Sequence, residues 1–376
     1  MNICIVASGY PTKKGTACVF VSKLADEFAE LGHNVSFIAP QSITKVLYRD
    51  GAFSPTEFVH KTRSGKVVRV YRPYIISFGG GKLGKKIYNV FLKYSLRKTL
   101  KKVSSPDVFY AHFWGPAHGI YSVIKDRGIP LFVATGESEI SFRNPNDGFS
   151  EYVKGVICVS TKNKEESISK NLTRAEKCVI LPNAIDDSEF FLMDKQKCRM
   201  ELGIPSDAFV VGQVGTISNR KGQKRVSDAL KKLNDDSIYS FFLGRPVEAI
   251  PDCKNIIRLG FTEHNMVPKY LNAADVYVFP SLAEGCSNSI VEAMSCGLPI
   301  ISSDLPFNHD ILDESNAILI DPRNIDQIAD AIKKLKNNPS LLDSMSKASL
   351  QKASELKLNV RAVKIIEFIK SRIPKS

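Results

Sequence analysis

The stretch FPSLAEGCSNSIVEAMSCGLPIISS, residues 279–303, joins the end of a strand to a turn and a short helix. The apolar run Val276–Pro280 predicts a buried strand, and Ile290, Ala293 and Met294 recur at the spacing of one helix face. A glycine and a proline then end the helix, and a second short apolar run follows. A strand, a helix and a strand in this order predict a βαβ unit of a parallel sheet.

The same alternation runs through both halves of the chain. The sequence therefore predicts an α/β fold made of two doubly wound, Rossmann-like domains that face a cleft. The strands predicted in the first half are Ile3–Ala7, Val35–Ala39, Val67–Val70, Val108–Tyr110, Leu131–Ala134, Val156–Ser160 and Lys177–Pro182. Those predicted in the second half are Phe209–Thr216, Tyr239–Leu243, Asn255–Gly260, Val276–Pro280, Ile300–Ser302 and Ala317–Ile320.

The domain boundaries follow from where this alternation pauses. We expect an N-terminal domain over residues 1–182, a polar linker over 183–205 and a C-terminal domain over 206–358. Residues 359–376 are expected to form a helix that packs back on the N-terminal domain.

The composition of the chain indicates the cellular compartment in which the protein is expected. The longest apolar runs fall far short of the roughly 18 residues that a membrane helix needs, and the chain starts with a strand-like segment rather than a signal peptide. Eight cysteines occur without CxxC spacing, which is typical of reduced thiols. A cytoplasmic protein is predicted.

The net charge of +13 resides in the first half, and residues 51–106 carry 13 basic side chains against one acid. Within them, residues 79–103 interleave cations with apolar side chains, which predicts a basic amphipathic helix at the inner face of the membrane. The alternative is a helix packed on the sheet with a solvated basic face. No nucleic-acid motif accompanies the charge, so nucleic acid is not an expected partner. The predicted membrane-contacting residues are Lys85, Lys86, Lys93 and Arg97.

Glu284 and Glu292 bracket the start of the predicted helix. A helix N-terminus carries partial positive charge and unpaired N–H groups, which suit a phosphate. Carboxylates beside it can accept hydrogen bonds from a ribose and from a second polyol, so the pattern indicates a nucleotide-diphosphate sugar. In the alternative interpretation, Glu284 caps the helix and Glu292 is a solvated surface residue.

Arg220 and Lys221 follow another predicted strand and precede a helix. At that sheet edge they would face a diphosphate, with arginine as a fork and lysine as a point charge. The alternative is a solvated basic turn.

Taken in order, these segments resemble the retaining glycosyltransferase family 4, which has the GT-B fold. The Glu-x7-Glu block is the most specific part, and the resemblance spans about the whole chain. The matching segments are Tyr10-Pro11 with Gly15, Gly32–Val35, Leu181–Asp186, Arg220–Gly222, Ala273–Ser281, Glu284–Met294 and Gly297–Ile300.

The resemblance implies roles for individual residues. Lys221, assisted by Arg220, would neutralise the diphosphate, Glu284 would contact the transferred sugar, and these three are the predicted catalytic residues. The resemblance implies a UDP- or GDP-sugar donor, no cofactor and no metal, and front-face substitution in which the leaving diphosphate takes the acceptor's proton. The predicted donor-binding residues are Gly15, Thr216, Gly285, Cys286, Ser287, Asn288, Ser289 and Glu292.

Some positions depart from the family pattern. Thr216 stands where an arginine is usual, with Arg220 as the candidate replacement. In the first domain His112 and Glu137 are the predicted acceptor contacts, although His112 could be scaffold and Glu137 could cap a turn. His118 is expected to be structural.

The function predicted from these observations is hexosyl transfer to a lipid-linked or glycan acceptor, in bacterial lipopolysaccharide, capsule or glycolipid assembly. Two alternatives remain open. One is another reaction on nucleotide sugars, such as epimerisation, and the other is a non-catalytic GT-B partner that binds a nucleotide sugar.

Overall fold

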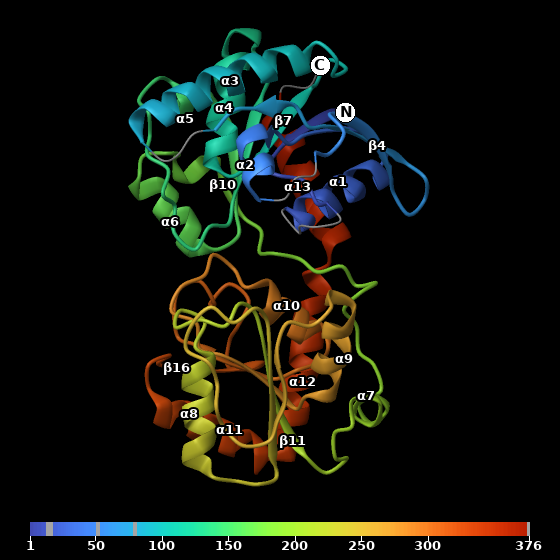
Figure 1. Ribbon diagram of the computed structural model, residues 1–376, viewed down its shortest axis with the longest axis vertical. Coiled ribbons are helices and arrows are strands. Elements are labelled where there is room, and N and C mark those ends of the chain that lie inside the picture. Colours follow the sequence, from blue (N-terminus) through green and yellow to red (C-terminus); the bar gives the residue numbers. More distant parts are fainter. Residues whose placement is uncertain (13–17, 50–52, 78–80, 374–376) are drawn as a thin grey trace. The chain divides into compact units, whose positions relative to one another are not determined.

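The computed structural model (Figure 1) describes residues 1–12, 18–49, 53–77 and 81–373. The chain divides into two compact units. Unit 1 comprises Met1–Val159, Asn163–Leu181 and Leu358–Ser376, and unit 2 comprises Ser160–Lys162 and Pro182–Lys357.

Unit 1 is built on an eight-stranded sheet with the order β10-β9-β8-β7-β1-β2-β5-β4. All neighbouring strands run parallel except the edge pair of β4 and β5, which is antiparallel. The strand order reverses direction at β1 and β7, which is the topology of a doubly wound sheet. The strands are β1 (Asn2–Val6), β2 (Asn34–Ile38), β4 (Glu57–Lys61), β5 (Val67–Tyr71), β7 (Val108–His112), β8 (Leu131–Thr135), β9 (Val153–Cys158) and β10 (Cys178–Ile180), and β3 (Gln41–Ser42) pairs separately with β6 (Tyr74–Ile75).

Helices cover both faces of this sheet. On one face α3 and α4 enclose a core with β1 and β7, and this core includes Leu92, Trp114 and Phe109. On the other face α1 packs against β2 and α13. The helices are α1 (Val19–Glu30), α2 (Ile43–Arg49), α3 (Lys82–Leu100), α4 (Trp114–Ile124), α5 (Phe149–Tyr152), α6 (Thr161–Ser169) and α13 (Leu358–Arg372), with short 3-10 turns η1 (Lys125–Arg127) and η2 (Ala175–Lys177).

The last helix, α13, completes unit 1 although it follows the whole of unit 2 in the sequence. It packs on α1 and β9. The fit is close at Gly155 of β9, where a Cβ atom would lie 2.7 Å from the ring of Phe368 and 2.8 Å from the ring of Phe132. A side chain at this position would therefore force these rings to shift.

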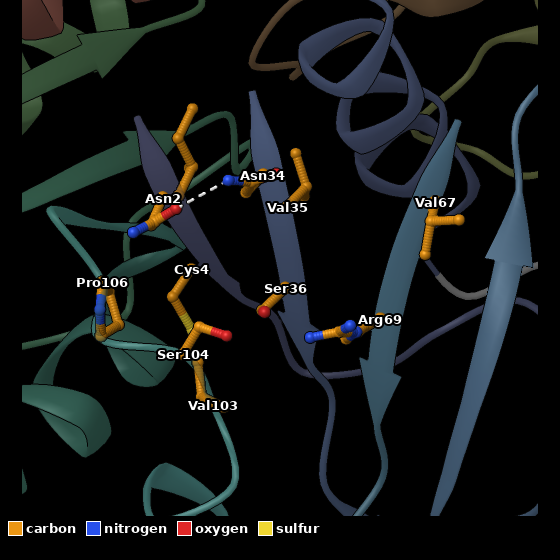
Figure 2. A pocket seen from close by; sticks show the side chains of 11 residues that line it. Asn2, Cys4, Asn34, Val35, Ser36, Val67, Arg69, Val103, Ser104 and Pro106 are labelled. Atoms are coloured by element: carbon orange, nitrogen blue, oxygen red, sulfur yellow. Dashed lines mark hydrogen bonds between the residues drawn. The ribbon is translucent and has the colours of Figure 1, made fainter. Parts of the chain in front are cut away.

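A polar pocket of about 260 Å³ lies at the amino-terminal ends of β1, β2 and β5 (Figure 2). The amide of Asn34 donates to the side-chain oxygen of Asn2 (3.0 Å), and Ser36 and Arg69 are paired in the sheet register. Ligands of doubly wound sheets bind beyond the carboxyl ends of the strands. This pocket lies at the opposite edge of the sheet, where the strands begin.

Unit 2 contains a six-stranded, all-parallel sheet with the order β13-β12-β11-β14-β15-β16. Numbered within the unit this is 3-2-1-4-5-6, the order of a dinucleotide-binding sheet, with the switch point between β11 and β14. The predicted α/β class and the two Rossmann-like sheets are thus confirmed. The strands are β11 (Phe209–Val214), β12 (Ile238–Leu243), β13 (Ile256–Gly260), β14 (Val276–Phe279), β15 (Ile300–Ser303) and β16 (Ala317–Ile320).

The helices of unit 2 also lie on both sides of their sheet. The pair α8 and α11 forms one core with β11, β14 and β15, while α10 packs against α12. The helices are α7 (Lys195–Leu202), α8 (Gln223–Leu233), α9 (Val267–Ala273), α10 (Asn288–Ser295), α11 (Ile325–Lys336) and α12 (Pro339–Glu355), with the 3-10 turn η3 (His264–Met266).

The stretch 183–205 differs from the predicted linker. It belongs to unit 2 and contains α7, whose first turn is capped by the Asp194 side chain accepting from the backbone N–H of Lys197 (2.7 Å). Arg199 of this helix is buried and donates to Asp275 (2.6 Å). The polar composition that suggested a linker thus supplies a cap and a buried ion pair.

Candidate active site

The site in unit 2 lies at the switch point of its sheet. β14 ends at Phe279, and the chain then turns through residues 280–287 into α10. Glu284, in the middle of this turn, is only 8% exposed. The neighbouring strand β11 ends at Val214 and leads to the loop that carries Arg220 and Lys221. Because the two strands are adjacent and parallel, both loops emerge at the same edge of the sheet.

Three donors converge on a single oxygen of Glu284. Nζ of Lys221 lies 2.6 Å from Oε1, and Nη1 of Arg220 donates to the same atom over 2.8 Å. The hydroxyl of Ser281 donates to it as well (2.7 Å). The Glu284 carboxylate is therefore held by three donors. In turn it holds the two cations of the β11 loop against the turn that leads to α10.

Lys221 is the more buried of the two cations. Its side chain is 14% exposed, and Nζ lies 4.8 Å from the centre of the Phe279 ring. Burial lowers the pKa of Lys221, and the nearby Glu284 carboxylate opposes that change. An ammonium group in so little water interacts strongly with any anion placed beside it.

Gly222 allows this approach of the two loops. Its φ is +85°, and a Cβ atom there would lie 2.7 Å from the carbonyl oxygen of Pro280. The carbonyl of the preceding residue, Lys221, accepts from the amide of Gln213 on β11 (3.0 Å). Backbone geometry and a buried amide thus fix where the lysine side chain begins.

The start of α10 faces the same region. Ser287 is the N-cap residue, and its own side chain makes no hydrogen bond that caps the N–H groups of the helix start. The hydroxyls of Ser287 and Ser289 lie 3.1 Å apart, and Asn183 donates to the carbonyl of Cys286 (2.9 Å). The helix dipole and these N–H groups make the position suitable for a phosphate.

The other predicted donor residues of unit 2 lie in the turn before α10, on α10 itself or just after β11. Glu292 is half-buried one turn into α10, while Gly285 and Asn288 flank the helix start. Thr216 is exposed just after β11, and its carbonyl accepts from Gln223 (3.2 Å). Gly15 lies outside the described residues.

The sequence predicts that the Glu284 block and the Arg220-Lys221 turn bind parts of one donor, but it predicts no contact between their side chains. The structure brings them into one cluster and adds Ser281, which was not predicted. No signal in the sequence marks this serine, because its role depends on the direction of the Glu284 side chain.

In unit 1, His112 ends the buried strand β7 and is 5% exposed. Its ring packs edge-on against Phe20 and Phe113, with centroids 4.8 and 4.2 Å away. Burial, with a smaller effect from Arg361, lowers its pKa to about 3, so the ring is neutral at physiological pH.

Glu137 accepts hydrogen bonds from the Thr135 hydroxyl (2.6 Å) and the Gly136 N–H (3.0 Å). This is the turn-capping arrangement that was one of its two predicted roles. Nε2 of His118 lies 3.0 Å from Oδ2 of Asp147, within hydrogen-bond distance.

Two family models match the chain. Residues 18–189 match Glycosyltransferase Family 4, and residues 194–352 match Glycosyl transferases group 1. The chain therefore belongs to the glycosyltransferases that these two models describe. The resemblance noted from the Glu-x7-Glu block is thereby confirmed.

The glycosyltransferase is similar to bacterial polysaccharide enzymes. It is 26% identical over 90% of both chains to the putative teichuronic acid biosynthesis glycosyltransferase TuaC of Bacillus subtilis. A UDP-Gal:alpha-D-GlcNAc-diphosphoundecaprenol alpha-1,3-galactosyltransferase of Escherichia coli is 28% identical over 51% of this chain and 53% of its own length.

Solved structures share its GT-B fold. Sucrose-phosphate synthase from Thermosynechococcus elongatus has a TM-score of 0.76 at 16% identity, with 98% of each chain covered. Anabaena HepE in complex with UDP and glucose has a TM-score of 0.73 at 19% identity, covering 99% of this chain and 100% of its own.

Proposed function

We propose that this glycosyltransferase moves a sugar from a nucleotide-diphosphate sugar to a membrane-associated, lipid-linked saccharide, with retention of configuration. The observation that carries the proposal is the cluster of Lys221, Arg220 and Ser281 on one oxygen of Glu284, beside the start of α10. The cations and the helix start suit a diphosphate, and the second oxygen of Glu284 suits the hydroxyls of a sugar.

The donor would span the cluster. Its ribose would be held by Glu292, its diphosphate by Lys221 and the N–H groups of α10, and its sugar by Glu284. Because the charge is neutralised by side chains and backbone groups, we propose that transfer needs no metal ion.

The chemistry we propose is a front-face substitution. The bond between the anomeric carbon and the diphosphate oxygen breaks, and the acceptor hydroxyl forms a new bond to that carbon from the same side. The acceptor's proton passes to the leaving oxygen, and the nucleoside diphosphate departs. Lys221 stabilises the charge that develops on this oxygen, which is the largest contribution to the rate.

The part of the proposal that concerns a membrane-associated acceptor is supported by the surface of α3. This helix carries no acidic residue, and Lys86 and Arg97 on its surface are exposed, as are Leu83 (71%) and Tyr94 (67%). Mixed cations and apolar groups on one helix suit an anionic bilayer surface. The side chain of Lys85 is outside the described part of the molecule. No helix in the described part of the chain is long and apolar enough to cross a membrane.

The test is sugar transfer by the purified protein, with UDP- and GDP-sugars as donors and a synthetic lipid-diphosphate saccharide as acceptor, in the presence of EDTA. We expect a product whose new linkage keeps the donor's anomeric configuration in its NMR spectrum, and we expect Glu292→Ala to lose turnover while melting as the parent does. Inversion, a requirement for metal, or conversion of the donor without acceptor would each contradict the corresponding part of the proposal.

A further inference from the structure

An apolar pocket of about 420 Å³ lies within unit 1, where α3 and α4 pack beside the carboxyl end of β1. Side chains from α3 form one wall, namely Tyr88, Leu92 and Leu96. Ile75, Pro116 and Phe142 close the other sides. Such a lining favours an uncharged, apolar occupant.

Three of the polar side chains that line this pocket already have partners. The hydroxyls of Ser42 and Ser77 lie 2.5 Å apart, and His118, which faces the pocket, is paired with Asp147 at 3.0 Å. Among the described residues that line it there is no lysine, arginine, aspartate or glutamate. A charged group of a ligand therefore has to be bound outside the pocket.

Asn89 marks where the pocket opens to solvent. It lines the pocket and is exposed on the surface of α3. Lys86 precedes it by three residues and Lys93 follows it by four, so both lie next to it on the helix surface. Cations thus flank the opening, and α3 carries no acid that would neutralise them.

We infer that this pocket binds the apolar chain of a phosphate-bearing lipid, whose phosphate is held at the opening by Lys86 and Lys93. The combination of a neutral apolar interior with cations beside Asn89 matches a chain ending in an anion. The inference rests on the proposed function for its biological meaning, because it assigns the lipid part of the acceptor to a place. The binding itself can be measured without any transfer reaction.

Lipid binding can be followed by the fluorescence of the single tryptophan of the chain. Trp114 is fully buried and directly precedes Gly115 and Pro116, which line the pocket. Full-length protein would be titrated with farnesyl diphosphate, farnesol or inorganic diphosphate while Trp114 fluorescence is recorded. We expect farnesyl diphosphate to bind at least tenfold more tightly than either of its parts.

Two variants locate the ligand. Asn89→Phe places a ring in the opening and should weaken farnesyl diphosphate binding about tenfold or more, because the ring blocks the apolar chain from entering and making its contacts. Ser169→Phe adds the same ring to an exposed position at the end of α6 and should bind as the parent does. Replacing Lys86 and Lys93 by glutamine should reduce the advantage of farnesyl diphosphate over farnesol.

Several outcomes would overturn the inference. Equal affinity for inorganic diphosphate and farnesyl diphosphate would indicate a site for free anions. Equal affinity for farnesol and farnesyl diphosphate would show that the phosphate is not bound. Unchanged binding in Asn89→Phe would show that the ligand does not enter this pocket. Thermal shifts with nucleotide sugars, recorded on the same proteins, report on donor binding separately. A failure of donor binding is therefore distinguishable from a failure of lipid binding.

Discussion

Nζ of Lys221 lies 2.6 Å from Oε1 of Glu284, although the two residues belong to different loops of the sheet edge. Lys221→Met removes the buried positive charge and should lower kcat by about 10²–10³-fold, because the leaving diphosphate loses its main cation. Steady-state kinetics with saturating donor would measure this. Lys224→Met, which removes a cation three residues later that pairs with Asp228 and Asp252, should leave turnover unchanged. Equal turnover in both variants would exclude a catalytic role for Lys221.

Gly222 offers a test of how the loop is held. Gly222→Ala forces a side chain at φ +85° and 2.7 Å from the Pro280 carbonyl, so we expect about 2–4 kcal/mol of destabilisation, with reduced activity. Gly203→Ala is the matched control, because its φ is +66° but no atom lies within 4 Å of the added Cβ. That variant should lose only about 1 kcal/mol in urea unfolding. Similar losses in the two variants would show that contact with Pro280 does not matter.

The cations of α3, of which Lys86 and Arg97 are exposed and Lys93 is half-buried, should govern membrane association. Changing Lys86, Lys93 and Arg97 to glutamine should weaken binding to vesicles that contain anionic lipid by about 3 kcal/mol, since each cation near such a surface contributes about 1 kcal/mol. Vesicle sedimentation at low and high salt measures the effect. Glutamines at the exposed Lys333, Lys334 and Lys364 lower the net charge equally and should change binding little. If both triple variants bind alike, total charge rather than α3 is responsible.

His112 predicts a pH dependence of stability. Its pKa falls from 6.5 to about 3 on folding, so below pH 6.5 the unfolded chain takes up a proton that the folded protein does not. The stabilisation is complete above pH 6.5 and falls as the pH drops towards 3, by about 1.4 kcal/mol for each unit. Urea unfolding at pH 7 and pH 5 should therefore show a smaller difference in His112→Phe than in the parent. An equal difference would mean that the ring is protonated in the folded state.

The order of strands and helices could be predicted because most strands are buried on both faces and read as continuous apolar runs. β4 escaped prediction for the opposite reason. Its residues, EFVHK, are only partly covered at the sheet edge, so no apolar run marks it. α7 escaped because its apolar face is narrow and its buried Arg199 reads as a surface residue.

The sequence predicts that the Glu-x7-Glu block and the basic turn share one edge of the second domain, but not that their side chains are in contact. The Glu-x7-Glu spacing and the basic turn are both visible in the sequence. Their meeting depends on β11 and β14 being neighbours although β12 and β13 lie between them in the chain. Ser281 could not be singled out, because its role depends on where the Glu284 side chain turns.

The close fit of α13 at Gly155 has a consequence for synthesis on the ribosome. The sheet of unit 1 is translated first, yet the helix that covers β9 emerges only after all of unit 2. Until then the apolar face around Phe132 stays uncovered, so we expect the nascent first unit to be a chaperone substrate while the second unit can fold ahead of it.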